Sequence, residues 1–133
     1  MEPIKQTVLH DPDNGKIGNC LSASLATLLH LHIEDVPLFS HNSAWIQDLN
    51  QWLQQFNLAY VLLYDFDDYC RTHGIIGCHH EISGHTDRGN EVTHSCVAVD
   101  GEVVFDPHPS DSGLDHILDS GIFVALRPWE FLK

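Results

Sequence analysis

Three residues have the types and the chain order that acyl chemistry at a thiol requires: Cys20, His94 and Asp106. A cysteine at the start of a helix is favoured as a thiolate, because the free N–H groups and the helix dipole stabilise negative charge. A histidine can take the thiol proton, and a carboxylate can orient that histidine. The trio therefore predicts a cysteine nucleophile assisted by a His–Asp pair.

The nucleophile requires a helix that begins at Cys20. Leucines at 21, 25, 28 and 29 recur at one helical face, which predicts a helix over residues 20–31. Small residues cover the other faces, so this helix is expected to be buried at the centre of the fold. An ordinary core helix whose first residue is a small, buried cysteine fits the same pattern and is the alternative.

The geometry of one hairpin decides whether His94 can meet Asp106. Asp100-Gly101 separates two apolar runs and is a strong hairpin signal. A two-residue turn would place Asp106 on the opposite face from His94. A three-residue loop, Val99-Asp100-Gly101 with a bulge at the glycine, would pair Ala98 with Glu102 and set His94 directly across from Asp106. We predict the three-residue loop, with Cys96, Ala98 and Val104 on the face of His94.

The remaining elements follow the same order of helices first and strands later. An amphipathic pattern predicts a second helix over 43–56, whose aromatic residues belong to the core. Helices followed by antiparallel strands indicate an α+β fold, and 133 residues without a linker or repeat indicate one domain over 1–133. Further predicted elements are a strand at 60–64, a short helix at 68–73, a strand that begins at 74–78, a loop at 83–90, and strands at 92–99, 102–106 and 122–126.

A thiol nucleophile also needs donors for the oxyanion that forms during the reaction. The backbone N–H of Cys20 is one candidate. A side-chain amide is the second, and Gln6 is preferred over Asn19 because the N-terminal arm can run past the start of the helix. Asn19 is expected to shape the turn before the helix or to contact substrate.

The chain at this point resembles the papain-like cysteine peptidase superfamily. Gln6, Gly18-Asn19-Cys20, the strand with His94, and Asp106-Pro107 occur in the order of the double-glycine leader peptidase-like domains. The resemblance implies a papain-like fold, in which a nucleophile helix and a second helix pack on an antiparallel sheet. It implies Cys20 as nucleophile, His94 as general base, Asp106 as its orienting group and Gln6 at the oxyanion. Shorter motifs are similar to small bacterial and phage proteins without an assigned function: Gly-Asn-Cys-Leu-Ser-Ala, Leu28-Leu29, Val36-Pro37, Trp52-Leu53, Ser83-Gly84 and residues 106–110.

The substrate of such an enzyme would be a peptide, a protein or a small amide, and the products would come from hydrolysis or from acyl transfer. Two loops, 84–91 and 107–114, flank the strand ends that carry the His–Asp pair. The candidate substrate contacts on these loops are His85, Arg88, His108 and Ser110, together with Asn19 beside the nucleophile.

Charge and composition exclude several other classes of function. Six Lys and Arg face nineteen Asp and Glu, and the net charge of −13 disfavours a nucleic-acid partner. No apolar stretch predicts a signal peptide or a membrane span. Four cysteines are few for a secreted disulfide scaffold, so they are expected to be reduced thiols in a cytoplasmic protein. The expected chemistry uses neither a cofactor nor a metal.

Two rival interpretations stay open from the residues alone. Cys70, His73, Cys78 and His80 have ligand types suited to zinc, although their spacing is irregular. The chain could also be a phage-type module that binds a host protein without catalysis and keeps the triad as a relic.

Overall fold

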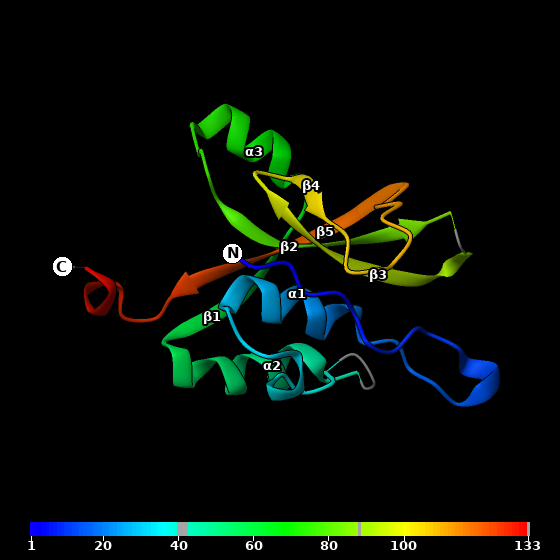
Figure 1. The fold of residues 1–133 in the computed structure, drawn as a ribbon. Helices are drawn as coiled ribbons and strands as arrows, with labels where there is room; N and C mark the ends of the chain where they lie inside the picture. The colour runs from blue at the N-terminus through cyan, green and yellow to red at the C-terminus, as the bar shows by residue number, and fades with distance from the viewer. Residues whose placement is uncertain (40–42, 88, 133) are drawn as a thin grey trace.

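A five-stranded antiparallel sheet forms the centre of the α+β fold (Figure 1). The computed structural model describes residues 1–39, 43–87 and 89–132. The sheet order is β1-β5-β2-β3-β4. In the described chain the helices are α1 (Cys20–Leu29), α2 (Trp45–Leu53) and α3 (Phe66–His73), and the strands are β1 (Leu58–Leu63), β2 (His79–Thr86), β3 (Gly89–Val99), β4 (Glu102–Phe105) and β5 (His116–Ala125).

Helices α1 and α2 lie on one side of the sheet and α3 lies on the other (Figure 1). The main core joins Leu21 and Leu25 of α1 with Leu49 and Leu53 of α2 and with Tyr60 of β1. This core confirms the amphipathic patterns that predicted the two helices. The aromatic side chains predicted for the core pack there as well, as ring pairs Phe39–Trp52, Trp52–Phe56 and Trp45–Tyr60.

Helix α1 begins at the predicted residue and is buried over seven consecutive positions, from Leu21 to Thr27. It ends two residues earlier than predicted, because His30 adopts a left-handed conformation with φ of 58° and caps the helix. The N-terminal arm runs beside the helix, where the Ile4 N–H donates to Thr27 Oγ1 at 3.0 Å. α1 is thus held between the sheet, α2 and the arm.

The largest differences from the strands predicted from the sequence occur at three places. Residues 74–78 do not begin a strand, because Gly74 and Gly77 take positive φ angles of 71° and 85° and turn the chain before β2. The predicted loop at 83–90 was wrong, since β2 continues to Thr86 and β3 begins at Gly89. β5 also begins earlier than predicted, at His116, because the polar residues before Ile122 pair with β2 in spite of their composition.

The hairpin that carries the His–Asp pair has a different register from the predicted one. Val99 pairs with Glu102, so Asp100 and Gly101 form a two-residue turn, with φ angles of 53° and 86° that are typical of type I′. Ala98 then pairs with Val103 and Val97 with Phe105. The prediction of a three-residue loop was therefore wrong.

A bulge in β4 compensates for the shorter turn. Val104 is the extra residue between two consecutive pairs, and its side chain is 54% exposed. One extra residue reverses the alternation of faces beyond it. Val103, rather than the predicted Val104, packs with Cys96 and Ala98. Beyond the bulge, Asp106 comes back to the side of His94.

None of the helices in the described part of the chain combines the length and the apolar content that crossing a membrane requires.

Candidate active site

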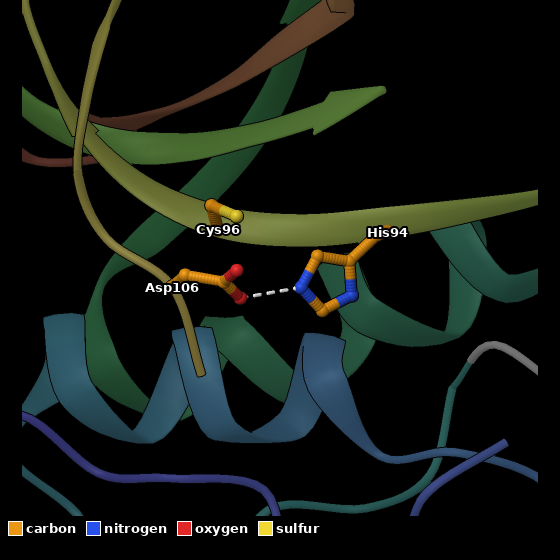
Figure 2. Close-up of side chains that lie close together, drawn as sticks. All are labelled: His94, Cys96 and Asp106. Atoms are coloured by element: carbon orange, nitrogen blue, oxygen red, sulfur yellow. Dashed lines mark hydrogen bonds and ion pairs between the residues drawn. The ribbon is translucent and has the colours of Figure 1, made fainter. Parts of the chain in front are cut away.

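A buried hydrogen bond joins His94 of β3 to Asp106, the residue that follows β4. His94 Nε2 lies 2.6 Å from Asp106 Oδ1, and the two side chains are 8% and 3% exposed (Figure 2). Because Nε2 is engaged, Nδ1 is the ring nitrogen left for another partner. The structure thus brings together the predicted histidine and carboxylate, although by a two-residue turn and a bulge rather than by the predicted three-residue loop.

The carboxylate of Asp106 is fixed by its own backbone surroundings. The His108 N–H donates to Oδ1 and the Gly113 N–H donates to Oδ2, each at 2.8 Å. Burial alone would raise the pKa of Asp106, but the hydrogen bonds from His94, His108 and Gly113 hold it well below its usual range. Asp106 therefore stays ionised and can orient the His94 ring.

His94 carries a proton well above neutral pH. Burial by itself would lower its pKa, but hydrogen bonding with Asp106, then with Cys20 and Cys96, raises it to about 11. Cys20 is half-buried at the first position of α1, within hydrogen-bonding contact of His94. The three residues predicted from the sequence to act together are therefore neighbours.

We expect His94 to give the ring NMR signals of an imidazolium at pH 8, where an ordinary histidine with a pKa of 6.5 is neutral. Since the folded pKa is the raised one, protonation of His94 contributes stability that is fully present below about pH 6.5 and is lost as the pH approaches 11. Asp106→Asn removes the largest stabilising contact and should lower the pKa of His94. Titration of wild-type His94 at or below pH 6.5 would contradict this picture.

The residue before α1 does not cap the helix with its side chain. Asn19 is a residue type that normally caps a helix, yet its side chain makes no capping bond. Its Oδ1 instead accepts from the Thr7 and Val8 N–H groups, and its Nδ2 donates to Thr7 Oγ1. Asn19 therefore shapes the approach of the N-terminal arm, and its contact with substrate stays a prediction. The first-turn N–H groups of α1 remain without this cap.

Gln6 is a residue of the N-terminal arm that contacts the segment after Asp106. Its backbone N–H donates to the Pro107 carbonyl at 3.0 Å, and its side-chain Nε2 donates to the Val8 carbonyl at 2.9 Å. The side chain is buried, and Oε1 has no hydrogen-bond partner. One Nε2 hydrogen is thus committed to the protein, and only the second can serve the oxyanion donor role predicted from the sequence.

The predicted substrate contacts separate into three groups. His108 lies beside the dyad, with its ring edge-on to that of His94 at 6.0 Å, and its Nδ1 bonds to Ser110. His85 is in β2, where its ring stacks on His116 at 6.2 Å and its Nδ1 is buried without a partner. Arg88 lies outside the described residues. The segment with His108 and Ser110 is the part of the predicted set that borders the dyad.

The rival zinc centre is not assembled. His80 uses both ring nitrogens in backbone hydrogen bonds: Nδ1–H donates to the Glu81 carbonyl at 2.8 Å and Nε2 accepts from the Gly101 N–H at 2.9 Å. The approach to Gly101 is close, since a Cβ there would lie 2.4 Å from the Asp67 Cα. The four residues predicted as alternative zinc ligands do not lie within reach of one ion: Cys70, His73, Cys78 and His80.

Sequence reasoning assigned no role in the site to Lys5 and placed Cys96 only on the face of His94. Lys5 Nζ donates to the Asp106 and His108 carbonyls at 2.9 Å each and pairs with Asp111, so it anchors the segment after β4. Cys96 is fully buried beside the dyad. Its place two residues after His94 on a strand was the available signal, whereas nothing local indicates the contact of Lys5.

Comparisons of the chain with protein-family models, with curated proteins and with solved structures found no match.

Proposed function

We propose that this protein is a papain-like thiol hydrolase or acyltransferase that acts on amide-type bonds through Cys20, His94 and Asp106. The observation that carries the proposal is the buried 2.6 Å contact between His94 and Asp106, placed where hydrogen bonding with Cys20 also contributes to the raised pKa of the histidine. The order of α1, with its N-terminal cysteine, before an antiparallel sheet with the His–Asp pair supports the papain-like assignment.

Acylation would begin with Cys20 as a thiolate and His94 as an imidazolium. The thiolate attacks the carbonyl carbon, and the carbonyl electron pair moves to the oxygen. The oxyanion is held by N–H donors at the start of α1 and by the second Nε2 hydrogen of Gln6. When the bond to nitrogen breaks, His94 gives its proton to the leaving amine, and an acyl-thioester remains on Cys20.

Deacylation would reverse these roles. Neutral His94, oriented by Asp106, takes a proton from water or from an acceptor amine as it attacks the thioester. The sulfur leaves as a thiolate, and the histidine is again protonated. Water gives hydrolysis and an amine gives acyl transfer, so both activities share the same first half-reaction.

The protein is further proposed to work in the cytoplasm on a peptide, a protein or a small amide. All four cysteines are free thiols, which fits a reducing compartment. The segment of His108 and Ser110 beside the dyad is the proposed place of substrate contact.

The proposal is tested by trapping the acyl-enzyme. Incubation with 4-nitrophenyl acetate followed by rapid acid quench should give a single acetyl adduct by intact mass, mapped to Cys20. Cys78→Ser is the matched control, because Cys78 is also half-buried but lies outside the site, and it should be acetylated like the wild type. A binding module with a relic triad would instead show no adduct, or adducts spread over several residues that persist in Cys20→Ala.

A further inference from the structure

Cys96 adds a thiol to the His–Asp pair. The ligand atoms of His94, Cys96 and Asp106 all lie within 4.8 Å of one another, and all three side chains are buried. Figure 2 shows Cys96 and Asp106 on the side of the His94 ring that carries Nε2. One imidazole, one thiolate and one carboxylate are ligands that zinc accepts in proteins.

We propose that His94, Cys96 and Asp106 form a binding site for a zinc-class divalent cation. The site differs from the zinc centre considered from the sequence, with which it shares no residue. Three protein ligands would leave a fourth position of a tetrahedral ion for water or another small ligand.

The distances require only a small adjustment. Zinc binds nitrogen and oxygen at about 2.0–2.2 Å and sulfur at about 2.3 Å, so neighbouring ligand atoms in a tetrahedron are roughly 3.3–3.8 Å apart. The His94 Nε2 to Asp106 Oδ1 distance would open from 2.6 Å, and the longest separations within the 4.8 Å set would close by about an ångström. On binding, the Nε2 proton of His94 and the thiol proton of Cys96 would pass to solvent.

The surroundings of the carboxylate support a metal ligand. The His108 and Gly113 N–H groups already fix both oxygens of Asp106, each at 2.8 Å. Hydrogen bonds of this kind orient a ligand before the ion arrives and strengthen metal sites. His94 and Cys96 are fixed in turn by their places on β3, the second strand from the sheet edge.

Metal occupancy and catalysis would exclude each other. An ion at Nε2 would displace the proton from that nitrogen, so the remaining ring proton would stay on Nδ1 and His94 could no longer take up the proton of Cys20. The ion would also engage the carboxylate that orients the ring. This inhibitory consequence rests on the proposed function, whereas the metal site rests on the three side chains alone. Cys20 is not among the residues of this ligand cluster.

Cobalt(II), a spectroscopic substitute for zinc, tests the site directly. Titration of the whole chain with Co²⁺ should give one bound ion, with the visible bands of tetrahedral cobalt and a thiolate-to-cobalt charge-transfer band. Cys20→Ser and Cys78→Ser should keep the charge-transfer band. Cys96→Ser should lose it, and its affinity should fall at least about tenfold.

A second variant covers the case in which Cys96→Ser fails to fold. Asp106→Asn keeps the thiol but replaces the charged ligand, and it should also bind the ion at least about tenfold more weakly. Zinc should raise the melting temperature of the wild type and of Cys20→Ser. The proposal would be overturned if the wild type bound no ion. It would also be overturned if Cys20→Ser lost the charge-transfer band while Cys96→Ser kept it. Cys20→Ser keeps these metal readouts separate from the proposed hydrolase, because it lacks the thiol on which the acetyl-thioester would form.

Discussion

Replacement of His94 by alanine is expected to slow the acetylation of Cys20 by about 10²–10⁴-fold, the usual contribution of a positioned acid–base group. The structure supplies the reason: His94 is buried, bonded to Asp106, and protonated well above neutral pH. Without His94, Cys20 loses both the imidazole that takes up its proton and the imidazolium whose positive charge stabilises the thiolate. The measurement is the rate of acetyl adduct formation from 4-nitrophenyl acetate.

Two further variants define this effect. Asp106→Asn keeps one of the two acceptor oxygens and loses the negative charge, so its rate should lie between those of the wild type and His94→Ala. His73→Ala is the matched control, because His73 is an exposed histidine at the end of α3. A rate for His94→Ala that matches the rate for His73→Ala would rule out the assigned role.

Replacement of Glu81 by alanine is expected to lower the free energy of unfolding by about 3–5 kcal/mol, because buried hydroxyl donors left without an acceptor cost roughly 1–3 kcal/mol each. Glu81 is fully buried and accepts hydrogen bonds from Tyr60 at 2.6 Å, Ser83 at 2.6 Å and Ser95 at 2.7 Å. These bonds join β1, β2 and β3, the strand that carries His94. Urea unfolding monitored by circular dichroism measures the change.

The close packing around the hydrogen bonds of Glu81 explains why a large fall in the free energy of unfolding is expected. A Cβ at Gly121 would lie 2.1 Å from the Tyr60 ring, so the tyrosine reaches Glu81 across a glycine.

Burial raises the pKa of Glu81, and wild-type stability should therefore fall as the pH rises through that folded pKa. Glu81→Gln should lack this pH dependence. Glu102→Ala is the control, because Glu102 is exposed. The prediction would be contradicted if Glu81→Ala lowered the free energy of unfolding by less than about 1 kcal/mol and by no more than Glu102→Ala does.

The sequence was most informative where structure depends on neighbours along the chain. The leucine spacing predicted α1 and its first residue, and the aromatic spacing predicted α2. The end of α1 was missed because His30 takes a left-handed conformation that histidine rarely adopts. Strand continuation into residues 84–86 was also missed, because pairing with β3 and β5 outweighs the loop-like composition.

For the candidate site, the sequence predicted which side chains meet but not the strand register that brings them together. His94 and Asp106 were paired correctly, but by a wrong register, since the Asp100-Gly101 turn favours two residues and the bulge at Val104 has no local signal. The hydrogen bonds of Asn19 to residues 7 and 8, and the network around Glu81, join positions distant in the chain. Hydrophobic periodicity does not report such polar contacts.

The central claim, that Cys20 is an activated nucleophile, is tested most directly by the rate at which iodoacetamide alkylates it at pH 7. Peptide mapping by mass spectrometry separates the four cysteines, two of which, Cys70 and Cys96, are buried. The site predicts that Cys20 reacts first, much faster than half-buried Cys78 and faster than a free model thiol such as glutathione. Reaction of Cys20 at or below the rate of the model thiol would contradict the claim.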